Sequence, residues 1–166
     1  MNNIILCGFM GCGKSSVGRK LAHISGREFV DTDRYIEEKT GMTVAEIFEQ
    51  KGEAGFRKIE TEVCGELSER DNLIIAAGGG TLTIPENVEI LRQGGKIVFL
   101  DVSYENLCER LSRDTRRPLL QVENRNEVIR ELLDKRLPLY RKAASIHVNG
   151  NFNSSVVANN ILNIIR

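Results

Sequence analysis

One octapeptide near the N-terminus limits what this chain can fold into more than any other feature. Residues 8–15 read Gly-Phe-Met-Gly-Cys-Gly-Lys-Ser and match the phosphate-loop pattern G-x-x-x-x-G-K-[ST] in full. A short, mostly apolar run at 3–7 precedes the octapeptide, and apolar residues at helical spacing follow it over 14–25. The sequence therefore predicts a strand, a glycine loop and a helix, the order in which a helix N-terminus meets a phosphate group.

The residue types of the octapeptide suit a nucleoside triphosphate. Its glycines let backbone N–H groups close around a phosphate, and the following helix N-terminus favours negative charge. Lys14 can bridge the β- and γ-phosphates of ATP, and the Ser15 hydroxyl can ligate Mg²⁺. The alternative, a glycine-rich turn that ends in Lys-Ser by chance, is disfavoured by the full match and its position. The loop alone does not separate a kinase from a motor, a GTPase switch or a sulfotransferase.

The rest of the chain alternates apolar runs with helical patterns. Further strands are expected at 29–31, 73–77, 96–100 and 145–148. The expected helices span 34–39, 44–50, 53–69, 127–136 and 154–165, and two more begin at Pro85 and Ser103. This alternation predicts a single α/β domain over residues 1–166, with helices on both faces of a parallel sheet.

Charge and cysteine content limit the classes of function. Lys plus Arg and Asp plus Glu number 23 each, which argues against a protein that grips nucleic acid or an acidic membrane through bulk charge. The four cysteines contain no C-x-x-C pair and indicate free thiols in a reducing compartment. The N-terminus lacks the pattern of a secretion signal, and no run approaches the roughly 20 apolar residues of a membrane span. We therefore expect a soluble, cytoplasmic protein.

Two carboxylates follow the second expected strand. Asp31 and Asp33 would lie at the sheet edge that faces the phosphate loop. One can hold Mg²⁺ through water while the other hydrogen-bonds a substrate hydroxyl. The alternative is that Asp33 only caps the helix that follows, and for the pair taken alone this structural role is favoured.

Arginines and glycines supply further candidates. Arg57 has Glu53 and Glu60 at helical spacing, which predicts either surface ion pairs or a guanidinium fork, oriented by Glu60, for a substrate carboxylate. The three glycines at 78–80 follow a buried strand and indicate close approach of the backbone to a ligand, although a flexible turn is the alternative.

A segment without periodicity, 114–126, has the character of a mobile lid. Its Arg117 can bring a guanidinium to the charge that develops at the γ-phosphate, although a solvated basic loop would look the same. Further on, Pro138 is expected to kink or end a helix and to leave Arg136 near the break. The alternative there is a basic helix end favoured by the helix dipole.

Together these segments resemble the shikimate kinase family over nearly the whole chain. The matching patterns are G-F-M-G-x-G-K-S at 8–15, D-T-D at 31–33, F-R-x-x-E at 56–60, G-G-G at 78–80, R-P-L-L at 117–120 and R-x-P-L-Y at 136–140. The resemblance implies a three-layer α/β/α P-loop kinase fold, like that of nucleoside monophosphate kinases, with a five-stranded parallel sheet of order 2-3-1-4-5. It implies transfer of the ATP γ-phosphoryl group to the 3-hydroxyl of shikimate, on the pathway to chorismate and aromatic amino acids.

The resemblance also assigns roles to residues. The catalytic residues would be Lys14, Asp33 and Arg117. Contacts to ATP would come from Gly11, Cys12, Gly13, Lys14, Ser15, Ser16, Arg117 and Asn153. Contacts to shikimate would come from Asp33, Arg57, Glu60, Gly78, Gly79, Gly80 and Arg136. Ser15 and Asp31 would support Mg²⁺. A lid at about 112–124 and a shikimate-binding region at about 31–60 are expected in a monomer.

The sequence departs from the family in three places. Ala77 stands where many relatives carry Thr or Ser, Asp101 ends an apolar run and competes with Asp31 as the Mg²⁺ partner, and 149–153 lacks the acidic and proline-bearing pattern near the adenine. Two other functions remain as alternatives. One is a related kinase, for instance of gluconate, and the other is a nucleotide-binding module without catalysis.

Overall fold

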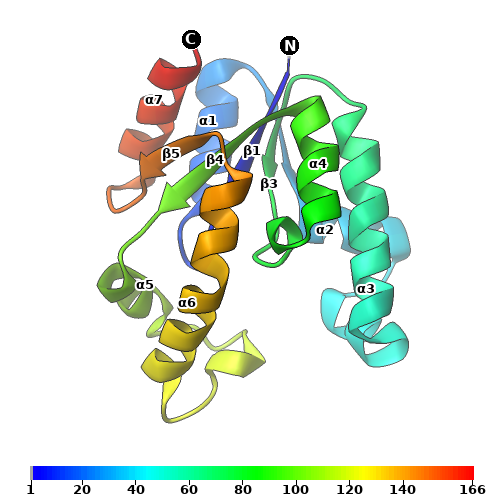
Figure 1. Cartoon of the computed structure of the whole chain (residues 1–166), viewed down its shortest axis with the longest axis vertical. Coiled ribbons are helices and arrows are strands. Elements are labelled where there is room, and N and C mark those ends of the chain that lie inside the picture. Colours follow the sequence, from blue (N-terminus) through cyan, green and yellow to red (C-terminus); the bar gives the residue numbers. More distant parts are fainter. Residues whose placement is uncertain (1) are drawn as a thin grey trace.

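The computed structural model describes residues 2–166 and contains one sheet of five parallel strands. The strands are β1 (Asn3–Cys7), β2 (Glu28–Asp31), β3 (Leu73–Ala76), β4 (Gly95–Asp101) and β5 (Ile146–Asn149). Their order across the sheet is β2-β3-β1-β4-β5, which confirms the order that the resemblance implied. Because all the strands run the same way, their carboxyl ends meet at one edge of the sheet (Figure 1).

Helices cover both faces of this sheet (Figure 1). They are α1 (Lys14–Ser25), α2 (Thr32–Thr40), α3 (Val44–Ser68), α4 (Pro85–Gly94), α5 (Tyr104–Leu111), α6 (Arg125–Ala143) and α7 (Ser154–Ile165), with 3-10 turns η1 (Thr81–Thr83) and η2 (Pro118–Leu120). Helix α1 packs against α7, and α4 packs against α3 and β4. Within residues 2–166, no helix has the length and apolar character that crossing a membrane requires.

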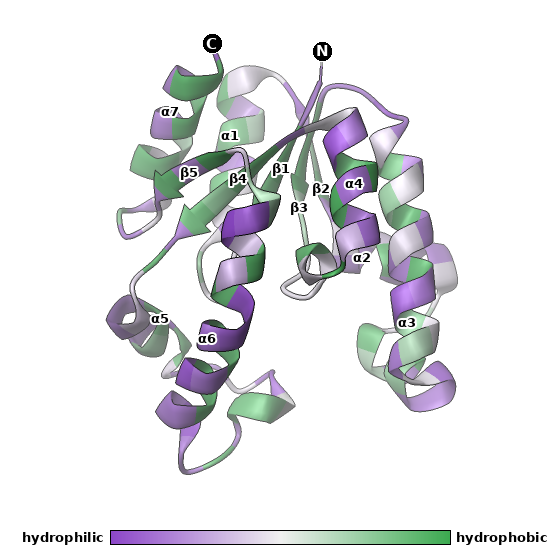
Figure 2. Ribbon diagram, in the orientation of Figure 1, coloured by the Kyte–Doolittle hydropathy of each residue, from purple (hydrophilic) through white to green (hydrophobic). Residues whose placement is uncertain are grey.

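The central strands form the middle of the core. Every residue of β1 and β3 is buried, as are residues 97–100 of β4. Figure 2 shows the hydrophobic residues concentrated in the strands and on the sheet-facing sides of the helices. Continuous apolar strands are what a parallel sheet needs when helices cover both of its faces.

Two differences from the expected helices exceed two residues. The helices expected at 44–50 and 53–69 form the single element α3, which Gly52 interrupts with φ 70° and ψ −179°. The expected end near Arg136 was wrong, because α6 continues through Pro138 to Ala143. Burial of Tyr140 and hydrogen bonds from Arg92 to the carbonyls of 142 and 143, at 2.8 and 3.1 Å, hold this last stretch of helix in place.

Candidate active site

Two adjoining pockets lie along the carboxyl edge of the sheet. The first has a volume of about 450 Å³ and extends from the phosphate loop to α3, the 78–80 turn and α6. The second, also about 450 Å³, lies over the N-terminus of α1 and reaches α5 and the start of α7. Both pockets are lined by five shared residues, which are Gly11, Gly13, Ser16, Arg116 and Arg117. The two pockets therefore form one cleft with the phosphate loop at its middle.

The phosphate loop ends on a left-handed glycine. Gly13 precedes α1 with φ 95° and ψ 17°, a conformation that favours glycine, and it offers no side-chain cap. The first N–H groups of α1 are thus left for a ligand, as at other anion-binding helix N-termini. The Lys14 ammonium donates to the carbonyls of Gly8 at 2.6 Å and Phe9 at 3.2 Å. The loop therefore wraps around the lysine that the sequence assigns to the phosphates.

Asp31 links this loop to the second strand. Its Oδ2 accepts a hydrogen bond from the Ser15 hydroxyl at 3.1 Å, and its Oδ1 accepts from the N–H groups of Asp33 and Arg34 at 3.0 and 3.2 Å. The capping residue of α2 is therefore Asp31, not Asp33. The competing candidate for Mg²⁺, Asp101, has a half-exposed side chain 4.0 Å from Arg141 and is not among the described residues that line the cleft.

Asp33, freed from capping, lies in the cleft close to the glycine turn. A Cβ on Gly78 would lie 2.9 Å from its Oδ1. Burial, followed by the negative charges of Asp31 and Glu60, raises the pKa of Asp33 from 3.8 to about 6. A carboxylate with a pKa near neutrality can accept a proton from a hydroxyl and release it later.

Each glycine of the 78–80 turn leaves space for one of the polar side chains predicted to bind substrate. A Cβ on Gly79 would lie 3.2 Å from Arg136, and a Cβ on Gly80 would lie 2.6 Å from the nearest guanidinium nitrogen of Arg57. Together with Asp33 at Gly78, the turn brings an acid and two arginines to one place. A flexible turn does not explain this arrangement, because any side chain at 78–80 would displace a member of the site.

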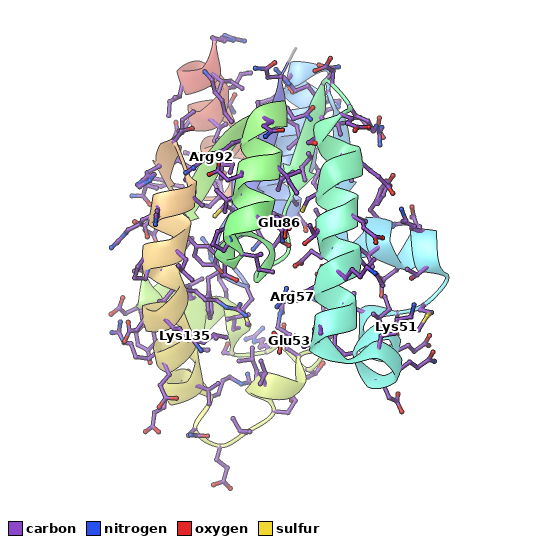
Figure 3. The ribbon with its side chains drawn as sticks, turned by 45° about the vertical axis from the view of Figure 1, so that its right-hand side comes forward. Lys51, Glu53, Arg57, Glu86, Arg92 and Lys135 are labelled. Carbon is purple, nitrogen blue, oxygen red and sulfur yellow. The ribbon has the colours of Figure 1, made fainter. Side chains whose placement is uncertain are left out.

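Arg57 is oriented by a buried carboxylate. Its Nη1 donates to Glu60 Oε1 at 2.9 Å, and its Nε lies 3.7 Å from Glu53. Glu60 is 1% exposed, so the pair does not have the form of a surface ion pair, the first of the two alternatives considered for Arg57. Figure 3 shows Arg57 projecting from α3 toward the space between α3 and α6. A buried acid paired with one side of a guanidinium leaves the remaining N–H groups for a ligand.

The lid segment folds back over the cleft around Asp114. The Asp114 carboxylate accepts from the backbone N–H groups of Arg116 and Arg117 at 2.9 and 3.0 Å and forms an ion pair with the Arg117 guanidinium. Arg125 donates to the carbonyls of Leu111 at 2.9 Å and Leu120 at 2.7 Å and so joins the two ends of the lid. Arg117 thus lies where the two pockets meet, with an acidic partner inside the lid.

Two polar residues of the second pocket are Asn153 and Arg110. Arg110 was not identified from the sequence. Asn153 uses its Oδ1 to cap α7 by accepting from Val156 N at 3.0 Å. Arg110 donates to the carbonyl of Cys12 at 3.3 Å and to that of Gly150 at 3.0 Å. No local pattern marks Arg110, because it is one of several charged residues on α5 and reaches the phosphate loop only through the fold.

An apolar wall of the first pocket was also missed as a site feature. Val44, Phe48 and Phe56 line it, and the two phenylalanine rings lie 4.7 Å apart between centroids. In the sequence, Phe56 stood out only as the first residue of the F-R-x-x-E pattern, without a role in the site. The contact with Phe48 forms across the interruption at Gly52, which periodicity does not reveal. The cleft therefore offers an apolar surface that adjoins Arg57, whose guanidinium lies 5.3 Å from the centroid of the Phe56 ring.

Known proteins resemble the chain over nearly its whole length. The family model described as "Shikimate kinase" matches residues 10–166. A protein named shikimate kinase from Acinetobacter baumannii (strain AYE) is 50% identical over 149 residues, which cover 90% of this chain and 83% of the relative. A solved structure, "Shikimate kinase from Acinetobacter baumannii in complex with shikimate", has a TM-score of 0.92 at 47% identity and covers 99% of this chain and 93% of that one.

A gluconokinase from Sinorhizobium meliloti shares the fold alone. Its TM-score is 0.60 at 16% identity, with 98% of this chain and 90% of that one covered. This likeness does not support the gluconate alternative, because a fold shared at such low identity carries many different activities.

Proposed function

Because the chain belongs to the shikimate kinase family, we propose that Lys14, Asp33 and Arg117 carry out its reaction in the cleft described above. The reaction is the transfer of the γ-phosphoryl group of ATP to the 3-hydroxyl of shikimate, which yields shikimate 3-phosphate and ADP. The observation that carries the acceptor side of this assignment is the 78–80 turn, whose three glycines accommodate Asp33, Arg136 and Arg57.

Recognition of shikimate follows from the chemistry of that turn. Arg57 and Arg136 bind the carboxylate, since a guanidinium presents paired N–H donors to two carboxylate oxygens. Asp33 accepts a hydrogen bond from a ring hydroxyl, and the N–H groups of Gly79 and Gly80 supply donors. Val44, Phe48 and Phe56 pack against the apolar face of the ring.

Phosphoryl transfer depends on position and charge more than on a strong base. The substrate hydroxyl oxygen attacks the γ-phosphorus in line with the bond to the β-phosphate oxygen, its proton passes to Asp33, and ADP leaves. Lys14 and Arg117 stabilise the charge on the transferring group, and lid closure excludes water that would otherwise accept it. On the nucleotide side, residues 11–16 hold the phosphates and Asn153 lies near the adenine end.

Ser15 and Asp31 fit a magnesium ion that travels with ATP. Their oxygens are 3.1 Å apart beside the phosphate loop, and Mg²⁺ prefers a few protein oxygens completed by water and phosphate. Within residues 2–166 no cluster of three or more His, Cys, Asp or Glu side chains could hold a metal by itself, consistent with an ion bound mainly by the nucleotide. Ser15 and Asp31 would hold such an ion, which would neutralise phosphate charge, and the hydrogen bond to Asp31 fixes the Ser15 hydroxyl beside the phosphate loop.

A coupled assay of ADP release tests the function. Shikimate, gluconate and nucleoside monophosphates are compared as acceptors with Mg²⁺ and ATP, and turnover with shikimate alone is expected. Preference for gluconate would support the related-kinase alternative, and ATP binding without any acceptor turnover would support the non-catalytic module. Replacing Ser15 by Ala is expected to raise the Mg²⁺ concentration needed for half-maximal rate, whereas replacing Asp101 by Ala is not.

We also propose that the protein works as a cytoplasmic monomer. The residues assigned to both substrates come from one chain and meet in one cleft, and the four cysteines are free thiols, as expected in a reducing compartment. Sedimentation of the purified protein over a range of concentrations, with and without substrates, measures the oligomeric state directly.

A further inference from the structure

A buried chain of polar groups runs from Glu60, which lines the cleft, to Thr81 and Asn87 behind the 78–80 turn. Glu60, Thr81 and Asn87 are each 1% exposed or less. The Thr81 hydroxyl donates to Glu60 Oε2 at 2.7 Å, and the Asn87 amide donates to the Thr81 carbonyl at 3.0 Å. Thr61 completes the chain by donating to Asn87 Oδ1 at 2.7 Å. The chain therefore connects α3, η1 and α4 through hydrogen bonds that are buried between Glu60, Thr81 and Asn87 and part-buried at Thr61.

The two oxygens of Glu60 have separate partners. Oε1 accepts from the Arg57 guanidinium at 2.9 Å, while Oε2 accepts from Thr81. The orientation of the carboxylate, and with it the position of Arg57, thus depends on the Thr81 hydroxyl. Without that hydroxyl, a buried carboxylate oxygen would lack a donor, which is costly and favours rearrangement of the acid.

The turn itself is held by neighbouring side chains as well. Tyr140 donates to the Gly79 carbonyl at 2.5 Å, Thr83 donates to the Gly80 carbonyl at 2.7 Å, and Gly78 N donates to Thr32 Oγ1 at 2.9 Å. With the carbonyls bonded away from the cleft, the N–H groups of 79 and 80 have no acceptor among the described residues. The same set of hydrogen bonds therefore fixes the arginine and the amide donors relative to each other.

We propose that Thr81 and Asn87 are positioning residues for recognition of the substrate carboxylate. Thr81 acts through Glu60 on Arg57, and Asn87 acts through the Thr81 carbonyl on the turn. Neither residue lines the cleft, so neither touches the substrate. This inference rests on the proposed function, because it assigns the carboxylate of shikimate to Arg57.

Variants of Thr81 test the first step. Thr81→Val keeps the shape but removes the hydroxyl, and we expect KM for shikimate to rise on the order of tenfold, the scale of one unpaired buried polar group, with KM for ATP unchanged. Thr81→Ser keeps the hydroxyl and should retain a KM within about twofold of the original. Equal KM values for shikimate in the Val variant and the original protein would overturn the proposal.

A double-mutant cycle separates positioning from general damage. If Thr81 acts through Arg57, adding Thr81→Val to Arg57→Ala should lower kcat/KM for shikimate by no more than about twofold. An equal loss from Thr81→Val in both backgrounds would show that the hydroxyl does not work through Arg57.

Asn3 provides a matched control for Asn87. Both side chains are buried and donate to backbone carbonyls, but Asn3 donates to those of Leu67 and Arg70, at the opposite end of β1 from the phosphate loop. Asn3→Ala and Asn87→Ala should both lower Tm, whereas only Asn87→Ala should raise KM for shikimate. Equal effects of the two on KM would refute a positioning role. Absence of turnover by the unaltered protein would instead contradict the proposed function.

Discussion

Asp33 illustrates how a single residue can serve the reaction and weaken the fold. Its side chain is largely removed from water and lies near Asp31 and Glu60, two other acids, so its charged form is disfavoured. The result is a pKa of about 6 in place of the ordinary 3.8. Both the rate and the stability should therefore change with pH in ways that Asp33 alone explains.

The rate should fall on the acidic side of neutrality. Below about pH 6 Asp33 is protonated and cannot accept the hydroxyl proton, so kcat/KM for shikimate should decline about tenfold per pH unit. A profile of kcat/KM from pH 5 to 9 measures this, and Asp33→Asn should remove the acid limb along with most of the activity. A flat profile down to pH 5 would show that Asp33 is not required in its ionised form.

Stability should respond in the opposite sense. Because the folded-state pKa lies above the unfolded value, the folded state binds more protons between about pH 4 and 6, and the Asp33 contribution to stability decreases as pH rises through that window. Asp33→Asn should therefore be more stable than the original protein at pH 7.5, by about 1–3 kcal/mol. The difference should disappear near pH 4 in urea unfolding, and an equal difference at both pH values would contradict this origin.

The lack of a side chain at Gly80 should affect the binding of shikimate more than the stability of the fold. Its φ of −98° is open to any residue, but an added Cβ would meet the end of Arg57. Since a guanidinium can move aside, Gly80→Ala should leave Tm within a few degrees while raising KM for shikimate on the order of tenfold. Steady-state kinetics against both substrates checks this. A rise in KM for ATP of equal size would mean that the whole cleft had changed.

At the scale of elements, α3 combines two helical stretches that Gly52 sets at different angles. The first carries Phe48, the second carries Phe56 and Arg57, and the interruption lets the two rings meet at the apolar wall of the cleft. A continuous helix would place Phe48 and Phe56 eight residues apart along one axis, about 12 Å, too far for ring contact. The break is therefore a part of the site.

The same substitution at two glycines of α3 should have opposite effects. Gly52 has φ 70° and ψ −179°, a conformation essentially restricted to glycine that costs an L side chain about 1–3 kcal/mol, so Gly52→Ala should destabilise the protein. Gly65 lies in a regular stretch with open space around its Cβ position, so Gly65→Ala should stabilise it by about 0.5–1 kcal/mol without changing the kinetics. Denaturant unfolding compares the two, and equal signs would refute the role of the left-handed backbone.

For the helices and strands, both the correct and the wrong predictions from the sequence have identifiable physical reasons. Strands, and helices such as α7, could be predicted because burial and periodicity are local signals. The continuation of α6 past Pro138 could not, since burial of Tyr140 and the donors of Arg92 overcome the local effect of proline. The burial of Glu60 could not be predicted either, because its spacing also suits a surface and its second partner, Thr81, comes from another element.

At the scale of the whole molecule, the cleft is built from two segments that are held in place differently, the 78–80 turn and the lid. The 78–80 turn is held by buried groups of other elements, whereas the lid at about 112–124 is held by Asp114, which belongs to the lid, and by Arg125, which follows it. The sequence motifs, taken together, predicted which residues meet in the cleft. Motifs did not predict Arg110 or Thr81, because each acts through contacts made by the complete fold.

The lid should become ordered when both substrates are present. Binding of the γ-phosphate draws Arg117 from Asp114 toward the nucleotide, and amide hydrogen exchange over 112–124 should slow at least severalfold with ATP analogue and shikimate together. The buried strand β3 serves as the internal reference and should not change. Equal exchange in the lid with and without ligands would contradict a closing motion.

The difference between the turn and the lid has a consequence for inhibitor design. A compound that copies the carboxylate of shikimate would meet donors whose geometry is already set by Thr81, Tyr140 and Thr32, so little ordering free energy would be lost on binding. A compound that relies on Arg117 would first have to displace the ion pair between Arg117 and Asp114. Chemical optimisation of an inhibitor should therefore start from the carboxylate end, because a contact added there loses the least binding free energy to rearrangement of the protein.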